Sequence, residues 1–461
     1  MTLVSRGRRR SDDAAPAAPQ SATLRVSWPW WLHPAWALAL LTGATALVAV
    51  ALPTEVYLTW GVPKFLDQDS SLLLLVCATA LFVGILSVSL AASRGGSVDI
   101  LMNAKQIHWL RMLFACLFIL TVLGYVFWIL IAIAQGVRLD SLMSVLQREA
   151  GAISTLKADS RPVGGVTTLT QFGPVAIVIG FILRKIGHGG RGFYWMIPLA
   201  GLRYVFYAER LALIEVLVPL LVIAALTTDP RTRRGVFVRL APIFGVPALW
   251  ALFAVSEYSR SWIFYEQNTA MGFPAWVSLR LLGYYTTSFN NSALFFSQTQ
   301  STEVVPYFSL SGFWNAPGIE QLLPHPGFGG IAPEQWWAGA LSFLSNPEFT
   351  NAGSFLVVAG EFGPLLAIAY WLLVGAIAGA AFRAMTQGSV PALIANATLF
   401  ISILELPRIM YWSLGRATPI LIGIVLLALW YPRGSRGQRN RPTFASVTTA
   451  AGSAPESLRP G

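Results

Sequence analysis

Long apolar runs separated by short polar segments dominate the sequence. A run of about 20 apolar residues crosses the roughly 30 Å hydrocarbon layer of a bilayer as an α-helix. The pattern therefore predicts an all-α polytopic membrane protein. Only Glu209 and Arg210 separate two of the runs, which form either a tight hairpin or one bent element. The ten predicted spans cover residues 35–53, 71–92, 112–134, 165–183, 193–208, 210–227, 236–256, 354–381, 390–406 and 417–431.

Composition supports this class and excludes others. Hydrophobic residues make up 55% of the chain and charged residues only 11%, whereas soluble domains carry roughly 25% charged residues. The net charge is +11, but the basic residues are not interleaved with aromatics as a nucleic-acid groove requires, so no nucleic-acid partner is expected. The two cysteines, Cys77 and Cys116, lie inside apolar runs. With no metal cluster, P-loop or dinucleotide motif in the sequence, neither a metal nor a cofactor is expected.

The charge distribution predicts the orientation. Lys and Arg concentrate in residues 1–30, in residues 432–461 and in alternate connections, while Asp and Glu concentrate in the remaining connections. The positive-inside rule then places both termini in the cytoplasm, as disordered basic tails of a protein of the cytoplasmic (inner) membrane. The expected organisation is a seven-span membrane domain at 31–256, a large outer loop at 257–353 and a three-span membrane domain at 354–431.

Two of the outer segments are more than connectors. Residues 137–157 carry apolar side chains at helical intervals, which predicts an amphipathic helix. This helix lies in the membrane interface or packs on the outer loop, and the pattern leaves both open. The loop at 257–353 is rich in Trp, Tyr, Phe, Pro, Gly and Asn. Aromatic residues are depleted in disordered segments, so the loop is expected to be ordered and functional.

Arginines at the outer ends of the spans are the main functional candidates. Placing an ionisable residue inside a span costs about 2.5–3.5 kcal/mol on insertion scales, and the planar donor fork of Arg suits phosphate. Each arginine also has a structural interpretation: Arg203 snorkels to the headgroups, Arg210 pairs with Glu209 or Glu215, and Arg408 pairs with Glu405. The candidates are Arg203, Arg210, Arg260, Arg280, Arg408 and Arg416.

Two further residues are candidates for proton transfer. Glu361 lies eight residues into the predicted eighth span, where Gly360, Gly363 and Pro364 loosen the helix. It is either a half-buried group that holds a proton or the buried partner of an outer arginine. His325 in the outer loop is a candidate general base. The aromatic residues of the loop either stack on sugar rings or form its own core; they are Tyr284, Tyr285, Tyr307, Phe313, Trp314, Trp336 and Trp337.

Four stretches of the chain resemble one family. They are Ala208-Glu209-Arg210-Leu211-Ala212-Leu213, Glu257-Tyr258-Ser259-Arg260, Arg280-Leu281-Leu282-Gly283-Tyr284-Tyr285 through Asn290-Asn291, and Asn346-Pro347-Glu348-Phe349-Thr350-Asn351 followed by Glu361-Phe362-Gly363. They are similar to Wzy-type oligosaccharide repeat-unit polymerases (O-antigen polymerases), over residues 200–375. The family often has Asp where this chain has Glu361, which leaves the role of that residue open.

The resemblance implies a metal-independent glycosyltransferase of the membrane-embedded GT-C type. Its substrate is an oligosaccharide linked to undecaprenyl pyrophosphate, and membrane lipids, a chain-length regulator and a flippase are the other implied partners. The implied pyrophosphate contacts are Arg210, Arg260 and Arg280. The catalytic candidates are Glu361, His325, Arg260 and Arg280, and the substrate-binding candidates are Arg203, Arg210, Glu257, Tyr284, Tyr285, Asn291, Arg408 and Arg416. Two alternatives stay open: a ligase or other GT-C transferase, and a polysaccharide transporter or flippase.

Overall fold

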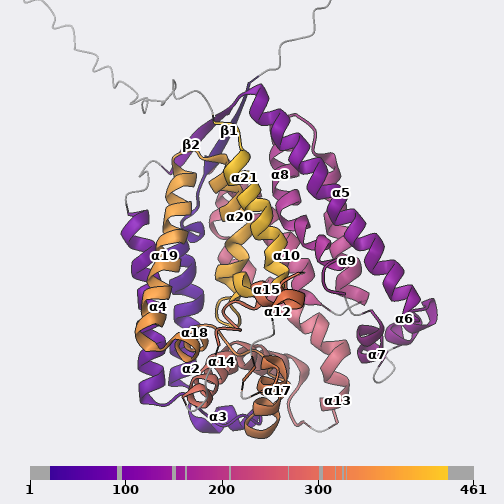
Figure 1. The fold of residues 1–461 in the computed structure, drawn as a ribbon, viewed down its shortest axis with the longest axis vertical. Helices are drawn as coiled ribbons and strands as arrows, with labels where there is room; N and C mark the ends of the chain where they lie inside the picture. Colours follow the sequence, from indigo (N-terminus) through magenta and orange to yellow (C-terminus); the bar gives the residue numbers. More distant parts are fainter. Residues whose placement is uncertain are drawn as a thin grey trace, which may run out of the picture.

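The computed structural model describes residues 21–90, 96–147, 152–160, 163–206, 209–267, 269–300, 305–316, 318–323, 327–328 and 330–433. Helices dominate these residues, and they are arranged as a bundle with one small sheet at one end (Figure 1). The sheet pairs β1 (Ala22–Ser27) with β2 (Ser97–Met102) in antiparallel register, with Leu24 opposite Ile100. Alternate residues of both strands are buried against the helices below, as expected for a sheet with one covered face.

Within the described residues, five helical segments are long and apolar enough to cross a membrane. They are Pro34–Ala51, α4 (Gln68–Ser89), α5 (Ala104–Ala134), Thr167–Lys185 and α19 (Pro364–Thr386). Pro34–Ala51 combines α1 (Pro34–Ala37), the π-helical turn η2 (Leu38–Gly43) and α2 (Ala44–Ala51), and Thr167–Lys185 combines η3 (Thr167–Phe172) with α8 (Gly173–Lys185). The prediction of a helical membrane protein is confirmed, and the number of ten spans stays a prediction.

Other predicted spans correspond to shorter or broken helices. The fifth and sixth are α9 (Met196–Phe206), which follows η4 (Arg191–Trp195), and α10 (Arg210–Leu226). These two helices pack on each other, which favours the hairpin over one bent element. The seventh is α11 (Arg233–Arg239) and α12 (Ala241–Glu257), bent by 64° at their junction. The ninth and tenth are α20 (Val390–Glu405) and Gly415–Trp430, which joins η7 (Gly415–Ala417) to α21 (Thr418–Trp430).

The predicted eighth span is wrong at its outer end. The structure divides it into α18 (Phe355–Phe362) and α19, because Gly363 has a positive φ of 83° and Pro364 opens the next helix. Glycine adopts this conformation without a Cβ penalty, and proline favours the first position of a helix. Glu361 therefore belongs to a short separate helix rather than to the interior of a continuous span.

Close contact between α4 and α19 holds this side of the bundle together. A Cβ added at Gly375 would lie 2.2 Å from the Leu81 carbonyl oxygen, and one added at Gly84 would lie 2.2 Å from the Leu372 carbonyl oxygen. Only small residues allow two helix backbones to approach this closely, which is the usual basis of helix packing in membranes. The pair runs along one edge of the molecule, away from α5 (Figure 1).

The predicted outer loop is largely helical. Its longest helix is α14 (Phe273–Thr299), which packs on α2 and α18 at the end opposite the sheet (Figure 1). Trp337 and Tyr307 are buried in a core shared with α4 and α19, so for these two the core interpretation is confirmed. The other elements of this loop are η5 (Tyr258–Trp262), α13 (Ile263–Tyr265), α15 (Ser311–Trp314), α16 (Ile319–Leu322) and α17 (Pro333–Leu344). The helix α3 (Thr54–Thr59), which follows the first span, packs at the same end of the molecule.

Two short helices replace the predicted amphipathic helix at 137–157. They are α6 (Leu139–Leu146) and α7 (Ala152–Asp159), and they pack on each other beside the far end of α5 (Figure 1). Residues 148–151 lie outside the described part of the chain. The two remaining short elements are η1 (Trp30–Leu32), which follows β1, and η6 (Tyr411–Ser413), which lies between α20 and α21.

Candidate functional site

Two clusters of ion pairs lie at one end of the helix bundle. There α10, α12 and α20 have the ends that are farther from the sheet. The opposite end of α10 reaches β1, because the Ser27 hydroxyl donates to the Thr228 carbonyl oxygen. Gly388, just before α20, similarly lies against Val98 and Ile100 of β2. The charged residues at the start of α10 and the end of α20 are therefore a whole helix length away from the sheet.

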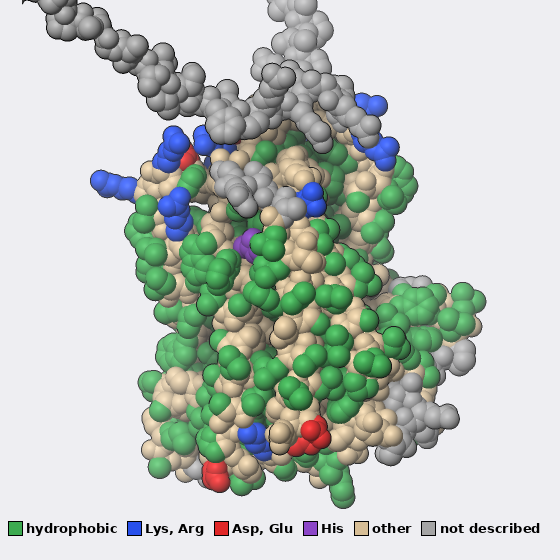
Figure 2. Space-filling model, turned by 90° about the vertical axis from the view of Figure 1, so that its left-hand side faces the viewer, with side chains coloured by type: hydrophobic (Ala, Val, Ile, Leu, Met, Phe, Trp, Pro, Cys, Tyr) green, Lys and Arg blue, Asp and Glu red, His purple; other side chains and the backbone are tan. Residues whose placement is uncertain are grey.

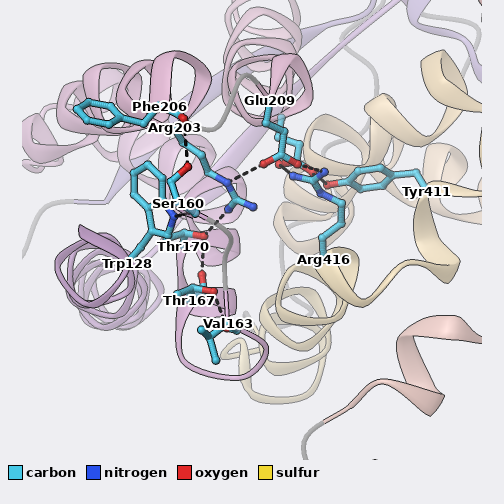
Figure 3. Close-up of polar contacts among 11 residues, drawn as sticks. Trp128, Ser160, Val163, Thr167, Thr170, Arg203, Phe206, Glu209, Tyr411 and Arg416 are labelled. Carbon is cyan, nitrogen blue, oxygen red and sulfur yellow. Dashed lines mark hydrogen bonds and ion pairs between the residues drawn. The ribbon is translucent and has the colours of Figure 1, made fainter. Parts of the chain in front are cut away.

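The first cluster, called the Arg416 cluster here, contains Arg203, Glu209, Glu215, Tyr411 and Arg416 (Figure 3). The Arg416 guanidinium lies 2.5 Å from Glu209 through Nη1 and 2.6 Å from Glu215 through Nε. Its Nη2 lies 3.0 Å from the second Glu215 oxygen. The Tyr411 hydroxyl donates to Glu215 at 2.6 Å. Both Nη atoms of Arg416 thus donate to carboxylates of the protein itself, while its Nε lies close to Glu215 without making a hydrogen bond.

Arg203 completes the Arg416 cluster from the opposite side. Its Nε lies 2.7 Å from Glu209 and its Nη1 donates to the Thr170 hydroxyl at 2.9 Å (Figure 3). Burial alone would raise the pKa of the Glu209 carboxyl, but Arg416 and Arg203 outweigh burial and lower it below its ordinary value. The cluster is therefore a set of paired charges that joins η3, α9, α10, η6 and η7.

The second cluster, called the Arg280 cluster, is built around a fully buried carboxylate. Glu257, with 0% of its side chain exposed, accepts from Arg210 at 2.5 Å and from Arg280 at 2.7 Å. Arg280 also donates to Glu348 at 2.9 Å, and the Tyr265 hydroxyl donates to the same carboxylate at 2.6 Å. Burial, followed by Glu348, raises the pKa of Tyr265. These bonds join α10, α12, α13, α14 and the segment after α17.

Tyr284 connects this cluster to a third ion pair. The guanidinium carbons of Arg210 and Arg408 lie 5.5 Å and 5.7 Å from the centroid of its ring, within the range of cation–π contacts. Arg408 binds Glu405 through Nη1 at 2.7 Å, and 25% of its side chain is exposed. The Arg408 Nε is buried without a hydrogen-bond partner in the structure.

Arg210 and Arg408 both retain hydrogen-bonding capacity. Arg210 binds Glu257 through Nη2, and Arg408 binds Glu405 through Nη1. A guanidinium carries five N–H donors, so a single carboxylate bond leaves donors for a ligand. The structure thus places two partly exposed guanidiniums around one aromatic ring. The term Arg210–Arg408 pair is used for them below.

The other predicted site residues differ in how they are held. The Asn291 side-chain amide donates to the carbonyl oxygens of Phe349 and Asn351, at 2.7 Å and 3.1 Å. Tyr285 follows Tyr284 on α14, close enough to Glu405 and Arg408 for their charges to act on its hydroxyl. Arg260 lies in η5, but its side chain is outside the described part of the structure, as is His325 altogether.

Among the described residues, no arginine pairs with Glu361, so the interpretation as the buried partner of an outer arginine is wrong for this part of the chain. Its carboxylate accepts from the backbone N–H groups of Tyr307, Phe308 and Ser309, at 2.9 Å, 2.6 Å and 3.0 Å, and from the Ser309 hydroxyl. Four donors on two oxygens fix the segment before α15 onto α18. A role in proton transfer stays a prediction.

The structural interpretation of Arg408 is confirmed, and those of Arg210 and Arg203 are wrong. Arg408 pairs with Glu405 as predicted. Arg210 pairs with Glu257 rather than with Glu209 or Glu215, because Arg416 occupies both of those carboxylates. Arg203 does not snorkel outward, since its side chain is buried against Glu209 and Thr170.

Sequence reasoning missed four members of the clusters: Thr170, Tyr265, Glu348 and Tyr411. Glu348 had the clearest signal, because it lies in the Asn346–Asn351 stretch on which the family resemblance partly rests. Among the described residues, no group of three His, Cys, Asp or Glu side chains is placed to hold a metal ion.

No family model, curated protein or solved structure matches the chain. The fold and the site therefore define a class without naming a relative. The protein is a helical membrane protein with a buried arginine–carboxylate network at one end of its bundle.

Proposed function

We propose that the protein is a membrane glycosyltransferase that polymerises oligosaccharide repeat units linked to undecaprenyl pyrophosphate. The observation that carries the proposal is the Arg210–Arg408 pair around Tyr284. Two guanidiniums with remaining donors suit the two phosphate groups of a pyrophosphate. The sequence resemblance to Wzy-type polymerases supports the same substrate class.

The distribution of charge supports the proposed orientation. Figure 2 shows Lys and Arg side chains gathered toward the end that carries the sheet, above a largely hydrophobic middle. Arg25, Lys105, Arg184, Arg233 and Arg383 belong to the elements at that end. Under the positive-inside rule, the sheet faces the cytoplasm and the site faces the outer side. The proposal includes α9, α10, the α11–α12 pair, α20 and α21 as further spans, which gives ten in a GT-C-like transferase.

The proposed reaction needs no nucleotide. An acceptor hydroxyl oxygen forms a bond to the anomeric carbon of the donor sugar, while the bond from that carbon to the pyrophosphate oxygen breaks. The lipid pyrophosphate leaves with the electron pair, and the hydroxyl proton passes to a base. Guanidiniums held in place before the reaction stabilise the charge that develops on the leaving phosphate.

A base is required beside the acceptor hydroxyl. Glu361 and His325 are the residues that the sequence proposes for this role. We add Glu348, because 40% of its side chain is exposed and it lies beside Arg280 in the Arg280 cluster. Glu361, in contrast, accepts four hydrogen bonds from the loop, so we propose that it serves mainly as an anchor.

The test is transfer by purified protein in liposomes that contain a single lipid-pyrophosphate-linked repeat unit. Wild-type protein should form glycosidic bonds and lengthen the chain without a second acceptor. Arg210→Ala and Arg408→Ala should each reduce the rate by about 10²–10³, the usual cost of removing a donor that stabilises developing charge. The matched control is Arg383→Ala, at the other end of the bundle, which should transfer normally.

Three outcomes would contradict the proposal. Chain growth that needs a separate lipid or wall acceptor would identify a ligase. Movement of the lipid-linked sugar across the bilayer without any new glycosidic bond would identify a transporter or flippase. Normal chain length in both arginine variants would remove the site from the reaction altogether.

A further inference from the structure

An apolar cavity of about 340 Å³ lies between helices of the bundle and is open on the side where Ile377 is 61% exposed. Its wall is formed mainly by α4, α10, α19 and α20, with residues from the start of the first span. From α19 it receives Val374, Ile377, Ala378 and Ala381, whose i, i+3, i+4, i+7 spacing places them on one helix face. The facing stripe on α20 includes Ala395, Leu399, Ser402 and Leu406.

The lining is almost entirely apolar. Asn396 and Ser402 are its main polar side chains, and the Asn396 amide donates to the Ala392 carbonyl oxygen of its own helix. A buried water needs two to four polar partners, and apolar cavities accept hydrocarbons instead. The cavity is therefore suited to hydrocarbon.

One end of the cavity lies beside the segment that carries Arg408. Leu406 and Trp412 line it, and Arg408 lies between them in the chain, two residues after Leu406. The stripe on α20 runs from Ala395 to Leu406, which is roughly 16 Å at 1.5 Å per residue. The other end, at Leu32 and Met385, lies toward the sheet. Hydrocarbon in the cavity would thus begin beside a guanidinium and extend toward the middle of the membrane.

The volume is large enough for part of a lipid chain. A CH₂ group is close in size to a water molecule, and a cavity of about 340 Å³ has room for several isoprene units of one chain.

We propose that this cavity binds the head-proximal isoprene units of a polyprenyl lipid whose phosphate lies at Arg408. The proposal rests on the proposed function for the identity of the headgroup and adds a site for the chain. The cavity would hold the first isoprene units along α20 and so position the phosphate relative to the Arg210–Arg408 pair.

The test uses a polyprenyl monophosphate with a photoreactive diazirine on its second isoprene unit, added to full-length protein in liposomes. This probe has no sugar, so its capture is independent of glycosyl transfer. We expect crosslinks to map to cavity residues of α19 and α20. Ala378→Phe and Ala395→Leu, which fill the cavity from two helices, should each reduce these crosslinks about tenfold.

The matched control is Ala380→Phe, on the same helix as Ala378 but with an exposed side chain that is not part of the cavity wall. It should leave the crosslinks unchanged. Thermal unfolding of all three variants identifies any variant that misfolds. If both filled variants misfold, the crosslink positions in wild-type protein still test the proposal.

Three results would overturn the proposal: wild-type crosslinks confined to lipid-facing surfaces, equal capture by filled and control variants, or displacement of the probe by phosphatidylglycerol as readily as by unlabelled polyprenyl phosphate. Capture in the cavity by a protein that makes no glycan would refute the proposed function alone. Normal chain growth by the Ala378→Phe and Ala395→Leu variants, without capture, would refute the cavity proposal alone.

Discussion

The Arg416 cluster and the Arg280 cluster use the same residue types in different ways. In the Arg416 cluster, both Nη atoms of the central guanidinium donate to Glu209 and Glu215, which Arg203 and Tyr411 bind in turn. In the Arg280 cluster, Arg210 is paired with Glu257, and the neighbouring Arg408 is paired with Glu405. Both arginines nevertheless keep unused N–H donors beside Tyr284. The first cluster holds helices together, and the second has donors available for a ligand.

The difference shows that arginine at the outer end of a span is not in itself a sign of phosphate binding. An Arg inside a membrane protein requires a partner, and a carboxylate of the same chain is sufficient. What separates the two clusters is the number of donors left after pairing. The predictions below test this distinction, from the largest expected effect to the smallest.

Glu257→Gln should have the largest effect on stability. The substitution leaves Arg210 and Arg280 without their shared carboxylate, and breaking a buried ion pair costs about 3–5 kcal/mol. Thermal unfolding in detergent should show a large fall in Tm. Glu348→Gln is the control in the same cluster, because its side chain is partly exposed and such a pair contributes about 0–1 kcal/mol. Equal small shifts in both variants would show that Glu257 does not organise the cluster.

A pair of Arg→Lys substitutions should separate stability from activity. Lysine keeps the charge but loses the planar fork. Arg416→Lys should destabilise the protein by about 2–3 kcal/mol, through lost charged hydrogen bonds. Arg408→Lys should change the free energy of unfolding by less than about 1 kcal/mol but reduce glycosyl transfer by about 10² or more. Tm and the rate of chain growth, measured on both variants, test the contrast. The reverse pattern would exchange the roles of the two clusters.

Glu361→Gln should loosen the segment before α15. The neutral amide loses the charge-assisted bonds from the backbone of Tyr307, Phe308 and Ser309, and a hydrogen bond to a charged group is worth about 1.5–3 kcal/mol. Limited proteolysis should cut residues 305–316 faster than in wild type. Glu266→Gln, an exposed carboxylate in the same outer region, should not change the cutting rate. Abolished transfer with unchanged proteolysis would instead make Glu361 the base.

The sequence was sufficient for features that depend on local order. Apolar runs located the helices that cross the membrane, and the spacing of three residues between Glu405 and Arg408 predicted their ion pair. The break before α19 was also readable, because Gly363 and Pro364 are typical helix punctuation. It was missed because the apolar run continues through it.

The clusters could not be derived in the same way. Arg210 and Glu257 are 47 residues apart in sequence, and Arg416 and Glu209 are 207 apart, so only the packing of the helices selects one carboxylate among several. The helix α14 was missed for another reason. Its buried face carries Asn290 and Asn291, which bond to neighbouring loops, and a hydropathy pattern interprets such a polar stripe as exposed.

The smallest predicted effect is a change with pH in the Tm difference between wild type and a Glu209 variant. The folded-state pKa of Glu209 lies below its ordinary value of 4.5, so ionised Glu209 contributes stability above that pH, and the contribution disappears as the pH falls through the folded-state pKa. Glu209→Gln removes this contribution at every pH. The Tm difference between wild type and the variant should therefore be constant from pH 7 to about 5 and narrow below that. Asp69→Asn, at an exposed position of α4, controls for the loss of one charge.

A difference that stays constant down to pH 3 would mean that Arg203 and Arg416 do not hold Glu209 ionised. The Arg416 cluster would then not be the set of paired charges that distinguishes it from the Arg280 cluster.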